Sequence, residues 1–423
     1  MTEPLPTARR TKAERVAVIG AGVVGLATAL TLRRRGDDVC LFDPEPPGSM
    51  TSFGNAALIA TSFVVPLAMP GFWKQIPEML LDPLGPLAFR WRHLPSMLPW
   101  FLRILAASTP RETDRIARTL VALVGRSIES WQSLLGPQAS ARLLQREGVL
   151  QVFRDPKKLA AMETEVALQR RHGVRVERIA AAELPQLEPA LARGLLDALF
   201  YPDVAHCIDP ATLSAELAAA FAREGGMIRR ERVRGLGLDS DGRPQTDSEA
   251  GAQRFDRIVI TAGVWSKELV EPLGTRIALE SERGYHLMLP HPGVRLRRPV
   301  RAGDHRFVMT PLAGGLRLAG TAEFAGLNAP PNWRRADLFL EPARALLPGR
   351  DGEDAVRWTG HRPSTPDSLP IIGPLANHPR IICAFGHGHL GLTLGAVTAE
   401  IVAAMTAGTK IPVDAVPLRP DRF

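Results

Sequence analysis

The sequence predicts an α/β protein (α+β overall) in which a doubly wound parallel sheet is accompanied by a second domain built on a mixed sheet. Three observations lead to this prediction. A strand, helix and strand open the chain; a strand, a glycine-rich turn and a helix close it; and apolar or alternating segments between them resemble the strands of another sheet. The 423 residues, of which 45% are hydrophobic, are enough for two domains.

The opening unit is read from apolar runs that end at glycines. Residues 15–19, Arg-Val-Ala-Val-Ile, are a continuous β-branched run typical of a buried strand. Residues 22–35 follow as a helix with small residues near its start and arginines at its end, where the helix dipole favours cations. Residues 39–43 form the next strand, which completes a unit of the length expected for βαβ.

The later elements place the opening and closing parts of the chain in one domain. Asp209 and Pro210 are a typical N-cap and first residue for a helix over 209–224. Further elements are predicted as strands at 254–260, 285–289, 307–310 and 316–319, and as a strand, turn and helix over 381–405. We therefore expect a discontinuous first domain of residues 13–65, 195–275 and 355–423, and a second domain of residues 66–194 and 276–354.

Charge and cysteine content narrow the classes of function. The net charge of +8 comes from scattered arginines without an aromatic-interleaved basic run, so we expect no nucleic-acid partner. The three cysteines, Cys40, Cys207 and Cys383, have no metal-ligand spacing, so we expect no metal site. Buried free thiols fit a reducing compartment, and we expect a cytoplasmic protein.

Membrane contact is a separate question. The N-terminus lacks the apolar core of a signal peptide, and we expect no spanning helix because no uncharged run approaches the roughly 18 residues required. Residues 63–105 are rich in Pro, Trp, Met and Leu and predict short, partly amphipathic helices. Either these helices pack on the second sheet, or Trp91 and Trp100 rest on the inner face of a membrane as a peripheral contact.

A dinucleotide signature lies between the first strand and the first helix. Gly20, Gly22 and Gly25 form G-x-G-x-x-G, with Val23 and Val24 inside the motif. The first glycine permits the tight turn, the second lets backbone amides approach a pyrophosphate, and the third allows the helix to pack closely on the strand. The helix N-terminus then faces the phosphates.

Asp43 completes this signature. It ends the next strand about 20 residues after the glycines, where a carboxylate can accept hydrogen bonds from adenosine ribose hydroxyls. A chance glycine-rich turn is the alternative, and the strand before it, the helix after it and the acid beyond it argue against that alternative. These residues alone do not separate FAD from NAD.

Three further segments resemble the flavoprotein family of D-amino-acid dehydrogenases, glycine oxidase and sarcosine oxidase. They are Thr51 to Ala57 (TSFGNAA), Ala262 to Ser266 (AGVWS) and Gly386 to Thr393 (GHGHLGLT). The similarity runs from about Val16 to the last helix and is greatest to the bacterial D-amino-acid dehydrogenases, including Trp358 to Pro363 (WTGHRP). It implies a Rossmann-like FAD-binding domain, with a mixed-sheet substrate domain inserted in it.

The resemblance also implies cofactor-binding residues. In relatives the segment like 52–57 passes beside the flavin, and the turn like 386–393 directs backbone amides at its pyrimidine edge. Fixed amide dipoles there would stabilise the negative charge of a reduced flavin. The implied FAD-binding residues beyond the glycine motif and Asp43 are Ser52, Asn55, Ala56, Val233, Ala262, Gly263, Trp265, Gly388, His389, Leu390, Gly391 and Thr393.

Four residues are implied at the substrate. Arg362 matches the arginine that relatives use for the substrate carboxylate, a task that suits the guanidinium fork. Arg283 would be a second carboxylate contact and Tyr285 would cover or hydrogen-bond the substrate; the alternative is a packed tyrosine and an interdomain salt bridge. His389 would face the flavin or substrate, or only cap its turn.

The implied reaction is oxidative deamination of a small D-amino acid by hydride transfer from Cα to noncovalently held FAD, since no cysteine matches the attachment position of some relatives. A secondary amine of the D-proline or hydroxyproline type is one candidate substrate. Electrons would pass to a quinone or another acceptor. The alternatives are a glycine- or sarcosine-type oxidase that uses oxygen, an NAD-dependent dehydrogenase, and a noncatalytic flavin subunit of an amine dehydrogenase complex. The sequence does not indicate the oligomeric state.

Overall fold

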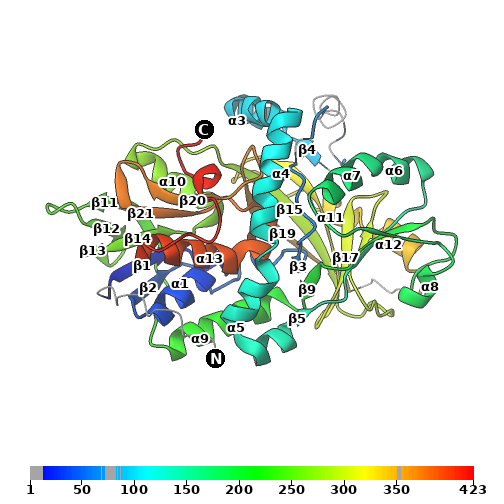
Figure 1. Ribbon diagram of the computed structural model, residues 1–423, viewed down its shortest axis with the longest axis horizontal. Coiled ribbons are helices and arrows are strands. Elements are labelled where there is room, and N and C mark those ends of the chain that lie inside the picture. The colour runs from blue at the N-terminus through cyan, green and yellow to red at the C-terminus, as the bar shows by residue number, and fades with distance from the viewer. Residues whose placement is uncertain (1–12, 68, 72–81, 83, 86, 350–353) are drawn as a thin grey trace, which may run out of the picture.

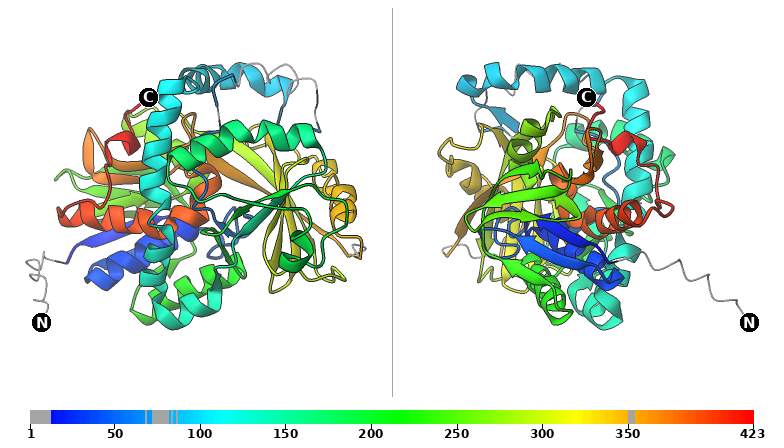
Figure 2. Two further views of the ribbon diagram at one scale, coloured as in Figure 1. Left: turned by 45° about the vertical axis from the view of Figure 1, so that its right-hand side comes forward. Right: turned by 90° about the vertical axis from the view of Figure 1, so that its left-hand side faces the viewer.

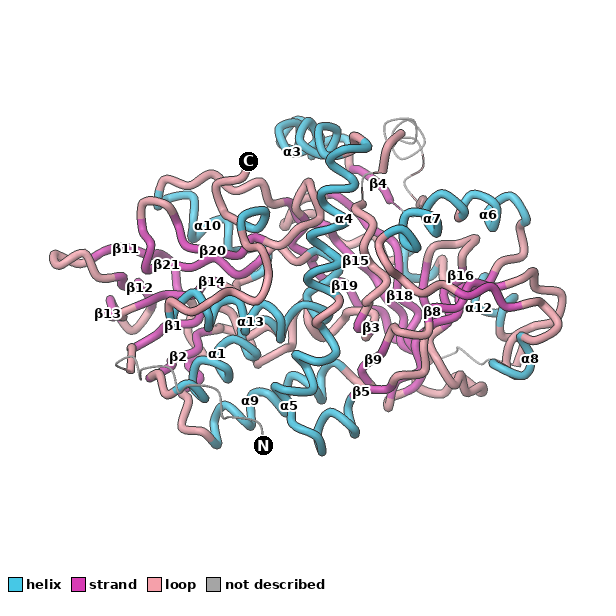
Figure 3. The backbone as a smooth tube through the Cα atoms, viewed as in Figure 1, coloured by secondary structure: helices cyan, strands magenta, loops and turns pink. Residues whose placement is uncertain are grey.

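The structure is a computed structural model that describes residues 13–423 except 68, 72–81, 83, 86 and 350–353. Two sheets dominate it, one in each half of the molecule (Figures 1 and 3). The six-stranded sheet has the order β10, β2, β1, β14, β21, β20 and the nine-stranded sheet has the order β19, β15, β18, β17, β16, β6, β8, β7, with β4 paired to β18.

The six-stranded sheet is parallel except for its last strand. Its strands are β1 (Arg15–Ile19), β2 (Asp38–Phe42), β10 (Met227–Arg229), β14 (Arg257–Ile260), β20 (Ile371–Leu375) and β21 (His378–Phe385). Alternation along β1 buries both of its faces, with Val16 and Val18 in one apolar cluster and Ala17 and Ile19 in another. A parallel sheet covered on both sides requires such strands.

Different elements cover the two faces of this sheet. The cluster around Val16 and Val18 includes residues of α1 (Val23–Arg35), α5 (Ser127–Leu143), α9 (Pro210–Arg223) and α13 (Gly391–Ala407). The cluster around Ala17 and Ile19 includes Val233, the first residue of a small antiparallel sheet, and Leu269 of α10 (Ser266–Val270). That small sheet consists of β11 (Val233–Leu238), β12 (Pro244–Ser248) and β13 (Gly251–Arg254).

The nine-stranded sheet is the mixed sheet of the second half. Its strands are β4 (Leu87–Phe89), β6 (Val149–Val152), β7 (Glu177–Ile179), β8 (Ala198–Tyr201), β15 (Glu280–Leu289), β16 (Val300–Ala302), β17 (Phe307–Leu312), β18 (Gly315–Phe324) and β19 (Val356–Ser364). A third small sheet joins β3 (Leu58–Ile59), β5 (Leu144–Gln145) and β9 (Ala205–Cys207). Among the described residues, the remaining α-helices are α3 (Leu94–Ala107), α4 (Pro110–Val124), α6 (Pro156–Ala161), α7 (Glu163–Arg171), α8 (Leu184–Leu187), α11 (Arg334–Asp337) and α12 (Leu340–Leu346).

The predicted strand, helix and strand at the start lie at 15–19, 23–35 and 38–42, and Asp209 caps α9 as expected. The predicted domain boundaries differ from the strand pairing in two places. β8 and β19 were assigned to the first domain, yet both pair within the nine-stranded sheet. Helices α4 and α5 were assigned to the second domain, yet their apolar sides belong to the cluster under α1 and α13. Figure 2 shows α4 as the long upright helix in cyan that crosses α13, which is red.

Two expectations about apolar segments are also revised. Residues 388–407, which end in α13, are long and apolar enough to cross a membrane, contrary to our prediction, but 72% of the relevant window is buried inside the protein as a core helix. Within 63–105 the described residues contain one long helix, α3, rather than several short ones, and residues 72–81 lie outside the described part. Trp100 of α3 is buried and donates its Nε1–H to the carbonyl of Ser364 at 3.2 Å.

Candidate active site

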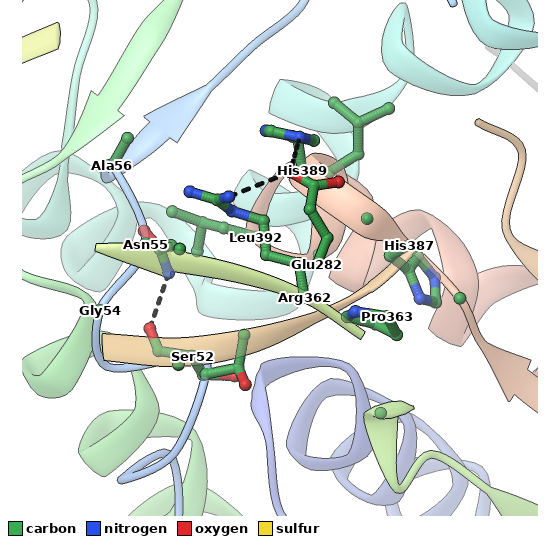
Figure 4. Close-up of a pocket in the computed structure, with 18 of the residues that line it drawn as sticks. Ser52, Gly54, Asn55, Ala56, Glu282, Arg362, Pro363, His387, His389 and Leu392 are labelled. Atoms are coloured by element: carbon green, nitrogen blue, oxygen red, sulfur yellow. Dashed lines mark hydrogen bonds and ion pairs between the residues drawn. The ribbon is translucent and has the colours of Figure 1, made fainter. Parts of the chain in front are cut away.

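A cavity of about 1230 Å³ is lined by residues of both large sheets. Single ligand sites usually measure roughly 300–1,000 Å³, so this cavity has room for more than one small molecule. Gly22 and Asp43 line it from the first half, and Glu282 and Arg362 line it from the second. Figure 4 shows part of its wall.

The glycine motif forms the turn that its sequence predicts. Gly20 has φ +107°, and a Cβ on Gly20 would lie 2.6 Å from the carbonyl oxygen of Thr261. A Cβ on Gly25 would lie 1.8 Å from the carbonyl oxygen of Gly20, so the helix can approach the turn only with glycine there. Gly20, Gly22, Val23 and Val24 line the cavity, whereas Gly25 packs behind them.

Asp43 lines the same end of the cavity. Its Oδ2 accepts from the backbone N–H of Ala21 at 2.6 Å and its Oδ1 from that of Glu45 at 2.8 Å. Burial raises the pKa of Asp43, while these two hydrogen bonds act in the opposite direction. The carboxyl group therefore ties β2 to the glycine turn.

Residues 52–57 connect this turn to the nine-stranded sheet. Ser52 Oγ accepts from the backbone N–H of Val23 at 2.9 Å. Arg317 Nη1 donates to the carbonyls of Phe53 and Asn55 at 2.9 and 2.8 Å. The hydroxyl of Thr310 donates to the carbonyl of Ala56 at 2.9 Å. Ser52, Asn55 and Ala56 line the cavity, so this segment is a wall held from both sides.

His286 adds a fifth hydrogen bond to this wall. Its Nδ1 lies 3.0 Å from the carbonyl oxygen of Gly54. Burial lowers the pKa of His286 to about 3, and the neighbouring Arg317 lowers it further in the same direction. The neutral ring can donate its Nδ1–H to this carbonyl.

The remaining residues expected at the cofactor lie as follows. Val233, Ala262, Gly263, Trp265, Gly388, His389, Leu390 and Gly391 line the cavity. Thr393 does not line it; its hydroxyl is buried, accepts from the N–H of Ala60 at 3.0 Å and donates to the carbonyl of Leu58 at 3.3 Å. Thr393 therefore holds the end of the 52–60 segment against α13.

Two long helices begin at this cavity. Helix α1 starts at Gly22 to Val24, and α13 starts at Gly391 and Leu392. All five of these residues line the cavity. Helix N-termini favour anionic groups because their first N–H groups lack partners within the helix. The glycines leave space for a ligand to approach, so these residues fit a dinucleotide whose pyrophosphate lies at α1.

The same cavity carries a cluster of three charged or titratable groups. Arg362 Nη1 lies 3.0 Å from Glu282 Oε1, and His389 Nε2 lies 2.7 Å from the same oxygen (Figure 4). Burial alone would raise the pKa of Glu282, but His389 and Arg362 outweigh it and lower this pKa to about 2. Glu282 is therefore ionised at neutral pH.

A strained backbone position supports Arg362. Arg362 Nη1 also donates to the carbonyl of Thr321 at 3.2 Å. Thr321 is the extra residue where β15 and β18 change register between Gly284 and Tyr285, and its φ is +48°. Positive φ is rare for a β-branched residue, and bulges of this kind re-aim groups beside active sites. Gly284 lies under the guanidinium, where a Cβ would come within 2.4 Å of Nη2.

Arg283 and Tyr285 do not line the cavity, which corrects their predicted contact with the substrate. Side chains alternate along a strand, so Glu282 and Gly284 face the cavity while Arg283 and Tyr285 face away. The Tyr285 hydroxyl donates to Glu323 Oε2 at 2.5 Å, and Arg283 Nη2 donates to the carbonyl of Ala329 at 2.6 Å. These contacts fit the alternative interpretation, in which Tyr285 is a packed tyrosine and Arg283 forms an ion pair. The ion pair of Arg283 is with Glu323 of the same sheet, however, and not between domains as that interpretation expected.

Two residues at this cluster, Glu282 and Thr321, were not among the predicted site residues. Glu282 directly precedes Arg283, which the resemblance implied at the substrate, and the alternation of side chains along β15 was the signal that could have selected it. Thr321 had no sequence signal, because a bulge in a strand is not specified by residue type alone.

Comparison with known proteins agrees with this geometry. Residues 15–405 match the DAO family, described as FAD dependent oxidoreductase. The chain is similar to a D-amino-acid oxidase of Bradyrhizobium diazoefficiens (strain USDA 110), with 36% identity over 96% of this chain and 98% of that protein. It is 35% identical to a D-amino acid dehydrogenase of Paramagnetospirillum magneticum (strain AMB-1), over 97% and 99% of the two chains.

Solved structures share the fold. Glycine oxidase from Geobacillus kaustophilus matches with a TM-score of 0.71 at 21% identity, over 98% of this chain and 100% of that one. Iminodiacetate oxidase from Chelativorans sp. BNC1 matches with a TM-score of 0.72 at 23% identity, over 96% and 99%. The glycine turn, the two helix N-termini and the full-length match together show that this chain belongs to the DAO family of FAD-dependent oxidoreductases.

Proposed function

We propose that this enzyme oxidises D-amino acids, with Arg362 as the anchor for the substrate carboxylate. The observation that carries the proposal is that Arg362 lines the same cavity as the dinucleotide turn. Among the described residues, only its Nη1 has hydrogen-bond acceptors, Glu282 and the Thr321 carbonyl. Its other donors are available to a carboxylate, which a guanidinium binds through two parallel hydrogen bonds. The names of the two full-length relatives support D-amino acids as the substrate class.

Bound FAD supplies the two-electron acceptor for hydride removal from the substrate Cα. The substrate also loses one N–H proton, and water then converts the imino acid to a 2-oxo acid and ammonia. Glu282 fixes Arg362 and the ring of His389 at one oxygen, so it orients both groups that face the cavity. Positioning of this kind is the main contribution a protein can make to such a reaction.

We propose that the FAD is held noncovalently. Cys40, Cys207 and Cys383 are all buried, and none of them lines the cavity. Burial raises the pKa of the thiols of Cys40 to about 11 and Cys207 to about 12, which keeps them protonated and unreactive. Acid precipitation of the purified protein should therefore release all of the flavin into the supernatant.

Reduction of the flavin under anaerobic conditions tests the substrate class. We expect D-amino acids to bleach the flavin absorbance and their L-enantiomers to leave it unchanged. Glycine, sarcosine and the hydroxyproline isomers belong in the same panel, because a secondary amine of the D-proline type is a candidate and would give a cyclic imine. A yellow protein that no amine bleaches would instead be a noncatalytic flavin subunit.

Electron transfer to a quinone at a membrane is our proposal for reoxidation, with oxygen as the second candidate acceptor. We further propose a cytoplasmic protein that contacts the inner face of the membrane peripherally. Trp100 is buried and cannot contribute, but Trp91 is 63% exposed, and Leu98 and Leu102 of α3 are 55% and 57% exposed. An exposed apolar helix face of this kind suits the interfacial region of a bilayer.

Vesicle binding tests this contact. Leu98→Ser with Leu102→Ser should release the protein from vesicles that contain anionic lipid. Met227→Ser is the matched control, because Met227 is 54% exposed but begins β10, the edge strand of the six-stranded sheet, outside α3. Equal binding of all three proteins would rule out α3 as the contact.

A further inference from the structure

A row of paired residues crosses the nine-stranded sheet on the face that floors the cavity. The register pairs Ala319 with Val308, Val308 with Arg301, and Arg301 with Gln151. Directly paired residues point to the same face of a sheet, and all four line the cavity. The small and medium side chains of Ala319 and Val308 at the start of this row leave space above them, and Arg301 stands beyond them beside Gln151.

The guanidinium of Arg301 has little to bind within the protein. Its Nη2 lies 3.4 Å from Ser62 Oγ, and its central carbon lies 5.1 Å from the centre of the Tyr201 ring. Arg301 forms no ion pair with any residue in the part of the chain that the structure describes. A guanidinium carries five N–H donors, so most of those on Arg301 are available to a ligand.

The groups around Arg301 form a polar end of the cavity. Glu165 and Gln169 line it, and Gln169 Nε2 lies 3.3 Å from Glu165 Oε1. Burial raises the pKa of Glu165, while Arg301 and Arg306 act in the opposite direction. Arg306 also lines the cavity, so two cations face one carboxyl group at this end.

We propose that this end of the cavity is a second anion-binding subsite, where Arg301 binds a carboxylate at the far end of the substrate. The inference rests on the proposed function, since the α-carboxylate of the same molecule is held by Arg362. The preferred substrates are then D-amino acids whose side chain ends in a carboxylate. Arg301 is a specificity-determining residue that contributes little to the oxidation of neutral amino acids.

Sheet geometry favours long side chains among these diacids. Arg362 lies on β19 and Arg301 on β16, four places apart in the sheet order. The register places Trp358 of β19 in the same row as Arg301, and Arg362 lies four residues further along that strand. At about 4.8 Å between neighbouring strands and about 3.3 Å per residue along a strand, the backbones of the two arginines are roughly 23 Å apart. The two arginine side chains bridge part of this distance and the substrate must bridge the rest, so kcat/KM should rise from D-aspartate to D-glutamate to D-2-aminoadipate.

Steady-state kinetics of the FAD-loaded enzyme with a dye as electron acceptor test the subsite. D-norleucine is the uncharged partner of D-2-aminoadipate, because the two have the same number of carbons. In wild type we expect kcat/KM to be about 10-fold higher for the diacid, the effect of a charge-assisted pair in a partly dry site. Arg301→Met should lower kcat/KM for D-2-aminoadipate by about 30-fold and leave that for D-norleucine within about 3-fold.

Arg297→Met is the matched control. Arg297 precedes the same strand, is exposed, does not line the cavity, and contacts the Gln186 carbonyl at 3.4 Å. Both substrates should react with this variant as with wild type. Flavin absorbance shows whether each variant is loaded, and inhibition of wild type by adipate relative to hexanoate gives a measurement that needs no variant.

The outcomes separate the subsite from the proposed function. If neutral D-amino acids reduce the flavin while wild type gains nothing from the far carboxylate, the subsite is wrong and the proposed function stands. Equal losses for both substrates in Arg301→Met would also overturn the subsite. If no D-amino acid reduces the flavin at all, the proposed function itself fails.

Discussion

The dinucleotide end and the substrate end of the cavity are built in different ways. At the first, backbone geometry dominates: Gly20 and Gly25 allow a turn that no Cβ would fit, and two helices begin there. At the second, side chains dominate: Arg362 and Glu282 from two strands meet His389 from the turn before α13 at one carboxylate oxygen. Backbone requirements leave a glycine pattern in the sequence, whereas side-chain clusters depend on which face of a strand each residue occupies.

The largest expected effect comes from breaking the backbone end. Gly25→Ala places a Cβ 1.8 Å from the carbonyl oxygen of Gly20, so the turn or the helix must move. We expect a nearly colourless protein, destabilised by roughly 1–3 kcal/mol or more. Flavin content and thermal unfolding measure this, with Gly237→Ala as the control, since the nearest atom to a Cβ there is 3.6 Å away. Full flavin loading of Gly25→Ala would contradict the close packing.

At the side-chain end, Arg362→Ala should leave flavin content intact and lower kcat/KM by about 100-fold, the loss of about 3 kcal/mol of charge-assisted hydrogen bonding. Arg362→Lys keeps the charge but not the fork, and should also raise KM. Arg357→Met on the same strand is the control, because Arg357 pairs with Asp337 and does not line the cavity. Near-normal kinetics of both Arg362 variants would remove this residue from the site.

Glu282→Gln tests whether one buried charge organises that end. The pKa of Glu282 is lowered from 4.5 to about 2, so its ionised form stabilises the fold above pH 4.5, and this contribution is lost as the pH falls towards 2. The shift corresponds to about 3 kcal/mol at neutral pH. Denaturant unfolding at several pH values should show wild type losing more stability than Glu282→Gln below pH 4.5. If the unfolding free energies of wild type and Glu282→Gln fall in parallel as the pH is lowered, the ionised carboxylate does not stabilise the fold.

The smallest effect sharpens the distinction between the two faces of β15. Tyr285→Phe should keep kcat/KM within about 3-fold, because Tyr285 faces away from the cavity. It should lose about 1–2 kcal/mol of stability, because the hydroxyl bonds Glu323 and the N–H of Asn332. A large change in KM with unchanged stability would show that Tyr285 contacts the substrate after all.

The sequence was sufficient where local rules dominate. The glycine motif, Asp43 and the cap of α9 lie where residue type and spacing indicated, and Arg362, which the resemblance implied, lines the same cavity. Arg283 and Tyr285 were assigned to the wrong side because a strand was recognised without its inward face. β8, β19 and the packing of α4 and α5 were misassigned because pairing between distant segments is set by tertiary contacts, which composition does not record.

The segment 52–57 has a mechanical consequence. It is bonded to the start of α1 through Ser52 and to β17 and β18 through Thr310 and Arg317, so the two halves cannot swing apart there without breaking several hydrogen bonds at once. The segment 52–57 is therefore a fixed point about which the two halves can rotate. Substrate and product must therefore pass through another side of the cavity, and any opening motion has to turn about these six residues.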